Sequence, residues 1–313
     1  MHELVPRILD GDKRAVARAI TRIEDNAADK YDILRDLHPY TGKAYLVGLT
    51  GAPGAGKSSL TDRIITYLRK ELNQRVGVIA VDPTSPFTGG AILGDRVRMG
   101  NHALDPGVFI RSMGTRGSLG GLSHTTQEAI RVLDAYGCDV ILIETVGVGQ
   151  SELDIMKVAD STVVVLNPSA GDHIQTIKAG IMEIADLFAI NKADLPGTDK
   201  TEREVNYMLD LLGHIPWRPP VVRTISRENK GIAELWSAVL AHKQHLEDSA
   251  LWLERRHKRR QTEIVTMVES HLARRVRELI EADTDWKGKL ASVEQGTADP
   301  FALADEMIGK LLK

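Results

Sequence analysis

Short apolar runs separated by helical patterns dominate the chain between residues 43 and 245. The runs are continuously apolar rather than alternating, which is typical of strands covered on both faces of a sheet. Strands that alternate with helices indicate βαβ units, so we expect an α/β fold with a mainly parallel sheet covered by helices. In such open sheets, ligands bind beyond the carboxyl ends of the strands. The expected strands lie at residues 46–49, 76–81, 108–110, 140–143, 163–166, 187–190 and 221–225.

A helical pattern precedes this region. The first 42 residues place Val16, Ile20 and Ile23 at helical spacing among charged residues. His38-Pro39 and the following Thr41-Gly42 mark the end of the helical prefix, because proline and glycine interrupt helices. The sequence therefore predicts an N-terminal helical extension at residues 1–42, an α/β domain at residues 43–245 and helical segments at residues 246–313.

The last of these parts begins with a long helix that carries one apolar stripe. Asp283 and Asp285 mark its end, and Asp299 and Pro300 suit the N-cap and the first position of a final helix. From its length, the stripe fits either helices that cover the sheet or, slightly better, an arm that pairs two subunits. The stripe residues are Ile264, Val268, Leu272, Val276 and Leu279, and the final helix is expected to turn Phe301, Ala304, Ile308 and Leu311 inward.

A phosphate-binding loop is predicted after the first apolar run. The spacing G-x-x-x-x-G-K-S at residues 51–58 follows an expected strand and precedes a helical pattern. Glycines allow backbone N–H groups to turn toward phosphates, and the helix N-terminus adds partial positive charge. We expect Lys57 to reach the β- and γ-phosphates and Ser58 to bind Mg²⁺. The predicted nucleotide-binding residues of this loop are Gly51, Ala52, Pro53, Gly54, Ala55, Gly56, Lys57, Ser58 and Ser59.

A guanine-binding motif is predicted after a later strand. In Asn191-Lys192-Ala193-Asp194, the Asp194 carboxylate can accept hydrogen bonds from N1–H and the 2-amino group of guanine. Adenine lacks this donor pair, so it would leave the carboxylate unpaired. Asn191 can support the other side of the base, and the stem of Lys192 can lie over the ring. Ser226, from a more degenerate match before Gly231, is a weaker candidate for the same pocket.

Acidic residues close two further strands and suggest a Mg²⁺ site. Glu144 ends an apolar run and Gly147 follows it, where its N–H could sense the γ-phosphate. Asp82 ends an earlier run, and Asp95 lies in the long loop after it; both could act on Mg²⁺ or the attacking water, although each could also form a turn or cap a helix. The long loop fits a nucleotide-dependent switch. We therefore predict Lys57, Asp82, Asp95 and Glu144 as catalytic residues, and Ser58, Asp82, Asp95 and Glu144 as metal ligands.

Two departures from small GTPases indicate slow intrinsic hydrolysis. Glu144 stands where those proteins use Asp, and Val148 stands where Ras-like proteins place a glutamine that positions water. Either Gln150, another group or a partner would then have to complete the site.

Composition narrows the class of protein further. A net charge of −3 gives no general attraction to nucleic acid or membranes. With Cys138 as the only cysteine, an intrachain disulfide is excluded, and we expect a packed thiol. We expect His242 and His245, three positions apart on a helix, to be solvated rather than metal ligands. No secretory signal or transmembrane run is evident, so a cytoplasmic location is predicted.

Together, these motifs resemble the MeaB/ArgK family of P-loop GTPases. The resemblance extends from about residue 46 to residue 306. The segments that carry it are GAPGAGKSSL, VDPTSPFTGGAILGDRVRM, ILIETVGVGQSELD, NPSAGDHIQTIKAGIMEIAD, NKAD and DPFALAD.

The resemblance implies a GTPase that acts as a chaperone for an adenosylcobalamin-dependent acyl-CoA mutase, usually methylmalonyl-CoA mutase. It implies a homodimer in which residues 246–313 form the dimerisation arm. It also implies gating of cofactor loading and protection of the mutase, with GTP or GDP and Mg²⁺ bound. The loop with Gly171, Asp172, Gln175 and Lys178 resembles an additional switch of the family.

Two other classes remain alternatives at this point. A kinase of the arginine/ornithine transport type would need an acceptor pocket, which no motif marks, and N-K-x-D favours guanine over the adenine of ATP. A metallochaperone GTPase that delivers nickel or cobalt would be expected to carry Cys or His clusters, and this chain has one cysteine and scattered histidines.

Overall fold

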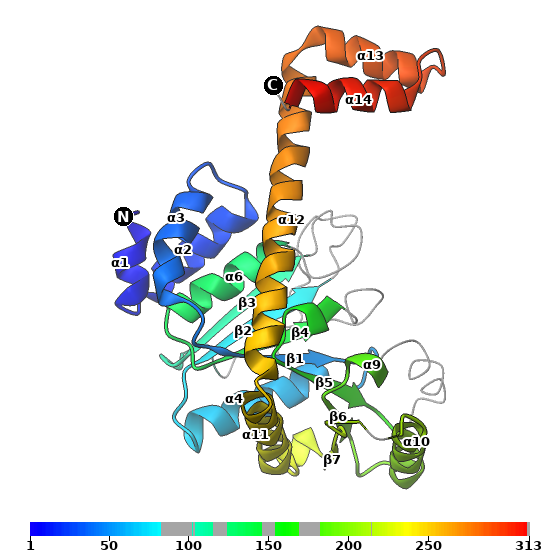
Figure 1. Cartoon of the computed structure of the whole chain (residues 1–313). Coiled ribbons are helices and arrows are strands. Elements are labelled where there is room, and N and C mark those ends of the chain that lie inside the picture. Colours follow the sequence, from blue (N-terminus) through cyan, green and yellow to red (C-terminus); the bar gives the residue numbers. More distant parts are fainter. Residues whose placement is uncertain are drawn as a thin grey trace. The chain divides into compact units, whose positions relative to one another are not determined.

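The computed structural model describes residues 1–82, 102, 104–114, 124–145, 154–168, 182–213 and 215–311. The chain forms two compact units, Met1–Arg255 and Arg256–Lys313. The first unit contains a central sheet with helices on both faces (Figure 1). The second consists of helices alone within the described residues.

The sheet of the first unit has seven strands within the described part of the chain, in the order β3-β2-β4-β1-β5-β6-β7. Every neighbouring pair is parallel, which confirms the fold predicted from the apolar runs. β1 lies between β4 and β5, so the chain departs to opposite sides of β1, and such a switch point is where ligands bind in open α/β sheets. The strands are β1 (Tyr45–Thr50), β2 (Val76–Asp82), β3 (Val108–Gly114), β4 (Val140–Thr145), β5 (Ser161–Leu166), β6 (Leu187–Asn191) and β7 (Val221–Thr224).

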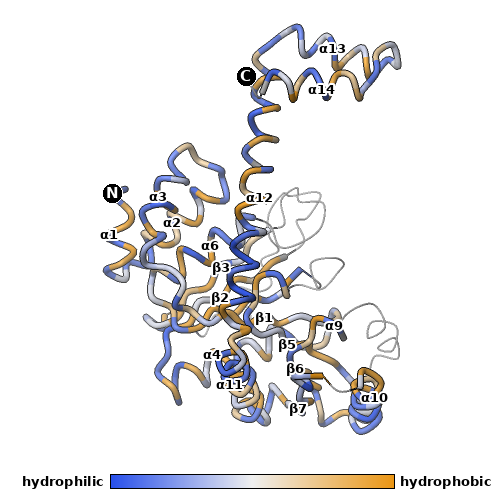
Figure 2. The backbone as a smooth tube through the Cα atoms, viewed as in Figure 1, coloured by the Kyte–Doolittle hydropathy of each residue, from blue (hydrophilic) through white to orange (hydrophobic). Residues whose placement is uncertain are grey.

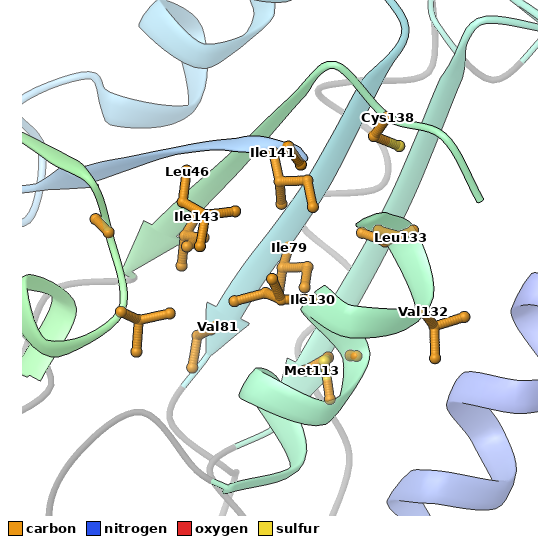
Figure 3. Close-up of a cluster of buried hydrophobic side chains, with 14 of the residues drawn as sticks. Leu46, Ile79, Val81, Met113, Ile130, Val132, Leu133, Cys138, Ile141 and Ile143 are labelled. Carbon is orange, nitrogen blue, oxygen red and sulfur yellow. The ribbon is translucent and has the colours of Figure 1, made fainter. Parts of the chain in front are cut away.

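Both faces of the sheet are buried because successive strand residues point to opposite sides. On one face, Ile79 of β2 and Ile141 of β4 pack with Ile130 and Leu133 of α6 (His124–Ala135), as Figure 3 shows. On the other face, residues such as Val47 pack against α4 (Lys57–Lys70) and α11 (Ile232–Asp248). The continuous apolar runs in the sequence reflect this double burial.

The N-terminal extension is an integral layer of the first unit. It contains α1 (Leu4–Leu9), α2 (Lys13–Glu24), α3 (Lys30–Leu37) and the short η1 (His38–Tyr40), and α2 and α3 pack against α6. Asp12 caps α2 by accepting a hydrogen bond from the Arg14 N–H at 2.8 Å. Lys30 forms a buried ion pair with Glu128 of α6 at 3.3 Å. Polar and apolar contacts therefore hold the extension on the sheet.

The remaining elements of the first unit are short segments and surface helices. α10 follows β6 and covers the face of the sheet that α6 also covers, through Val205 and Leu209. These elements are η3 (Ile155–Lys157), α9 (Met182–Ile184), α10 (Thr198–Leu211), η5 (Ser226–Glu228) and the start of α12 (Leu251–Ala282).

A buried polar network occupies the amino edge of the sheet. His242 of α11 is fully buried, and its Nδ1 lies 2.6 Å from the Ser161 hydroxyl. The same hydroxyl lies 2.6 Å from the Tyr45 hydroxyl, and His242 Nε2 lies 3.2 Å from Asp186 Oδ1. The expectation that His242 is solvated is therefore wrong, because α11 turns this side chain onto the first residues of β1 and β5.

The second unit contains the rest of α12, followed by α13 (Thr284–Glu294) and α14 (Pro300–Leu311). The predicted cap of α14 is confirmed, since the Phe301 N–H donates to the Asp299 carboxylate at 2.9 Å. Hydrophobic and hydrophilic residues alternate along α12 (Figure 2), and Ile264 is 61% exposed. Phe301 is 81% exposed and Ile308 is 53% exposed, so the expectation that they face inward is wrong for a single chain. Within the described residues, no helix is both long and apolar enough to span a bilayer.

Candidate functional site: a crevice at the carboxyl edge of the sheet

The predicted phosphate loop joins the carboxyl end of β1 to the first residue of α4. Gly51 has a φ of +139°, and a Cβ there would lie 2.2 Å from the Val165 carbonyl oxygen. Gly56, the N-cap of α4, has a φ of +90°, and a Cβ there would lie 2.4 Å from Asn191 Nδ2. These two positions require glycine for both conformation and space.

Lys57 is buried at the first position of α4. Its ammonium group donates to the Gly51 carbonyl oxygen at 2.5 Å and lies 3.2 Å from the Ala52 carbonyl oxygen. The cation therefore lies inside the curve of its own loop. Phosphate oxygens can compete with these carbonyls because a hydrogen bond between two charged groups is stronger than one to a neutral carbonyl.

Ser58, at the second position of α4, meets Glu144 near the end of β4. The Ser58 hydroxyl donates to Glu144 Oε1 at 2.6 Å, and the Thr61 hydroxyl lies 2.9 Å from Glu144 Oε2. Glu144 is 1% exposed and ends the part of β4 that lies next to β1. A hydroxyl beside a carboxylate is a set of hard oxygen donors, which suits Mg²⁺. The residues present therefore fit the predicted cation.

Asn191 connects three loops at this edge of the sheet. Its amide nitrogen donates to the Ala55 carbonyl oxygen of the phosphate loop at 3.0 Å. Its amide oxygen accepts a hydrogen bond from the Ser226 hydroxyl at 2.8 Å. The phosphate loop, the end of β6 and the turn after β7 are thus held together by one buried side chain.

The rest of the N-K-x-D motif faces the same crevice. Lys192 adopts a left-handed φ of +57°, and its ammonium group donates to the Gly54 carbonyl oxygen at 2.8 Å. The Asp194 side chain is 19% exposed and forms an ion pair with Arg227 at 2.8 Å.

A cavity of about 480 Å³ is lined by residues of the phosphate loop and of the N-K-x-D motif, and it is large enough for a nucleotide. Predicted phosphate-loop and base-binding residues therefore share one hollow. Its lining residues are Gly56, Ser58, Ser59, Asp62, Arg63, Asn191, Lys192, Asp194, Leu195, Ile225, Ser226 and Arg227.

Other predicted residues lie at or beyond the limits of the described structure. The backbone of Asp82 ends β2 at the same edge of the sheet, opposite Gly114 of β3, and its side chain is not described. Asp95 and Gly147 lie outside the described residues. So do Val148, Gln150 and the proposed additional switch at residues 171–178.

The fold brings further residues to this edge of the sheet that no sequence motif indicated. Thr61 lies three positions after Ser58, and this helical spacing could have indicated its contact with Glu144. Asp62 lines the cavity and lies 2.9 Å from His102 Nε2. No sequence motif indicated Arg227, since its ion pair with Asp194 depends on the geometry of the turn after β7.

Comparisons with known proteins also indicate a GTPase. The family model described as "Methylmalonyl Co-A mutase-associated GTPase MeaB" matches residues 16–281. A protein of Pyrococcus abyssi (strain GE5 / Orsay) with a GTPase name is 52% identical over 99% of this chain and 96% of its own length. The mouse protein named "Methylmalonic aciduria type A homolog, mitochondrial" is 38% identical over 74% of this chain and 60% of its own length.

The fold is also shared with a solved structure. A crystal structure described as an LAO/AO transport system kinase superposes with a TM-score of 0.69 and 25% identity. The match covers 99% of this chain and 97% of that one, so the helices at both ends are included in the similarity.

Proposed function

This chain belongs to the MeaB family of methylmalonyl Co-A mutase-associated GTPases, and we propose that it binds and hydrolyses GTP to regulate an adenosylcobalamin-dependent acyl-CoA mutase. Methylmalonyl-CoA mutase is the first candidate for this client, in keeping with the description of the family and the name of the mouse relative. In this role, the nucleotide state gates cofactor loading and protects the mutase from inactivation.

One observation carries the nucleotide-binding part of the proposal. Ser58 of the phosphate loop and Asp194, the predicted guanine-reading carboxylate, line the same cavity. Asn191 holds the phosphate loop and the turn after β7 together through hydrogen bonds to Ala55 on one side and Ser226 on the other. A guanine nucleotide would therefore place its phosphates and its base on residues from both motifs.

Different residues of the site would bind the phosphates and the cation. Lys57 would turn from the Gly51 carbonyl to phosphate oxygens and offset their charge, and backbone N–H groups at the start of α4 would bind the remaining oxygens. Ser58 and Glu144 would hold Mg²⁺, with Asp82 and Asp95 as further candidates. When bound, this cation neutralises charge that develops on the transferred phosphoryl group.

We propose that turnover is slow without a partner. The residue two positions after the end of β4, Gly147, is followed by Val148, which cannot orient a water molecule as a glutamine does. The client mutase would raise the rate by ordering the loops at the carboxyl edge or by inserting a group into the site. The segment at residues 171–178 is our candidate for relaying the nucleotide state.

We also propose that the protein forms a homodimer through residues 246–313. Several large apolar side chains of this part are exposed in the single chain, among them Ile264, Val268, Leu272 and Phe301. Exposed apolar surface of this extent is typical of protein interfaces. A second copy of the chain would remove these side chains from water.

The proposal is tested by GTP turnover of the purified protein alone and with the client mutase. We expect weak GTP turnover that rises several-fold with the mutase and disappears in Lys57→Ala. Pull-down from the native cell with GDP or a non-hydrolysable GTP analogue, followed by identification of the bound protein, would name the client.

Other activities would be detected by parallel assays. Stoichiometric transfer of phosphate from ATP to arginine, ornithine or a protein would favour a kinase instead. A tight stoichiometric nickel or cobalt site in calorimetry would favour a metallochaperone.

A further inference from the structure

Glu144 lies between two hydroxyl groups from the same helix. Ser58 and Thr61 are three residues apart on α4, so both point toward the end of β4. Ser58 donates to one carboxylate oxygen at 2.6 Å, and Thr61 approaches the other at 2.9 Å. All three residues are buried, and Thr61 and Glu144 are almost completely removed from solvent.

The direction of the Thr61 hydrogen bond follows from charge. The Thr61 oxygen also lies 3.0 Å from the Lys57 carbonyl oxygen, but a hydroxyl has a single hydrogen to donate. An ionised carboxylate is the stronger acceptor, so the hydrogen goes to Glu144. Thr61 and Ser58 then fix both oxygens of the carboxylate and hence its plane.

A glutamate at this position needs such fixing more than an aspartate would. Glu144 has one more rotatable bond than the aspartate that small GTPases use at the end of the corresponding strand. Each freely rotating side-chain bond that must be ordered costs conformational entropy. A hydrogen bond from a buried helix residue lowers that cost by holding the side chain in place before any ligand binds.

We propose that Thr61 is a positioning residue that orients Glu144 for the divalent cation of the nucleotide site. Ser58 can present its lone pairs to the cation while its hydrogen remains on Glu144, and Thr61 keeps the second oxygen from turning away. The inference rests on the proposed GTPase function, because it assigns Thr61 a role in the cation site of that activity.

The Thr61→Val variant tests this proposal because valine keeps the shape of threonine and removes the hydroxyl. The measurement is binding of a fluorescent GDP analogue in EDTA and in a Mg²⁺ titration. We expect affinity in EDTA to stay within twofold of the wild type. We expect the Mg²⁺ concentration that gives half of the Mg²⁺-dependent change in analogue binding to rise roughly tenfold. This is the size expected for the loss of one hydrogen bond to a charged group.

Three controls separate positioning from a structural role. Thr61→Ser should restore the Mg²⁺ response of the wild type. Thr66→Val on the same helix removes a hydroxyl that donates to the Asp62 carbonyl at 2.9 Å, and it should leave the Mg²⁺ response unchanged. In a Glu144→Asp background, the shorter carboxylate no longer reaches Thr61, so Thr61→Val should have little further effect.

The outcomes distinguish this inference from the proposed function. If Thr61→Val binds the analogue with the wild-type Mg²⁺ dependence, or if its affinity falls equally with and without Mg²⁺, Thr61 does not position Glu144. If the wild-type protein binds no guanine nucleotide under either condition, the proposed function fails first. A thermal melt of each variant confirms that folded proteins are compared.

Discussion

The side-chain amide of Asn191 donates a hydrogen bond of 3.0 Å to the Ala55 carbonyl oxygen, across 136 residues of sequence. This contact joins the predicted base-binding motif to the phosphate loop. The amide oxygen of Asn191 accepts a hydrogen bond from the Ser226 hydroxyl, so both ends of the amide have hydrogen-bond partners. The spacing between the predicted phosphate-binding and base-binding loops is thus fixed in the folded protein.

Removing the Asn191 side chain should lower both the stability of the folded protein and its affinity for GDP. We expect Asn191→Ala to lower the free energy of unfolding by about 1–3 kcal/mol, because buried partners lose their hydrogen bonds. GDP affinity should fall with it, since the two loops are no longer held in register. Urea unfolding and calorimetry measure the two effects. Asn206→Ala, which removes an amide that bonds to Glu202 on α10, should leave GDP affinity unchanged; an equal loss in both variants would refute the link.

Two glycines of the phosphate loop provide a matched pair. Both have positive φ, but a Cβ at Gly54 meets no atom within 4 Å, whereas one at Gly56 would lie 2.4 Å from Asn191 Nδ2. We expect Gly54→Ala to lower the free energy of unfolding by about 1 kcal/mol, from backbone strain alone. Gly56→Ala should cost more and weaken GDP binding at least tenfold, since it displaces Asn191. Similar unfolding curves for the two variants would contradict this.

The polar network at the amino edge should contribute to stability. His242 is completely buried between Ser161 and Asp186, so His242→Ala leaves a cavity and removes a partner of each. We expect a loss of about 2–4 kcal/mol in the free energy of unfolding. Gln244→Ala on the exposed side of α11 should change it by less than about 0.5 kcal/mol. A His242→Ala variant as stable as the wild type would show that the network does not contribute to stability.

The buried thiol predicts a stability change at alkaline pH. Burial raises the pKa of Cys138 from its ordinary 9.0 to about 12. Above pH 9 the unfolded chain releases this proton while the folded chain keeps it, so the thiol's contribution to stability falls as pH rises. The stability advantage of the wild type over Cys138→Ala should therefore shrink by about 1.4 kcal/mol between pH 8 and pH 10. Urea unfolding at both pH values measures the difference, and a constant gap would contradict it.

The sequence predicted the sheet well because its strands are buried on both faces. The apolar runs at residues 140–143 and 187–190 are short and uninterrupted, as expected of interior strands, and β4 and β6 contain them. The motifs also predicted residues that line one crevice, since Ser58, Asn191 and Asp194 lie at or after strand ends on the same edge of the sheet.

Contacts that depend on helix rotation or on distant turns could not be predicted. His242 reads as a polar residue on a surface helix, and only the packing of α11 on β1 and β5 shows that it is buried. Arg227 meets Asp194 through the geometry of a turn. Phe301 and Ile308 were expected to face inward because their spacing is amphipathic, but spacing does not tell whether the covering surface lies in the same chain.

We propose that Asp194 and Lys57 bind opposite ends of one guanine nucleotide. The decisive measurement is calorimetric titration of wild-type protein and Asp194→Asn with Mg²⁺-bound GDP and xanthosine diphosphate, with the exposed Asp199→Asn of α10 as control. We expect Asp194→Asn to lose at least tenfold in GDP affinity and to gain affinity for the xanthine nucleotide, because the amide offers both a donor and an acceptor. Unchanged GDP binding by Asp194→Asn would contradict it.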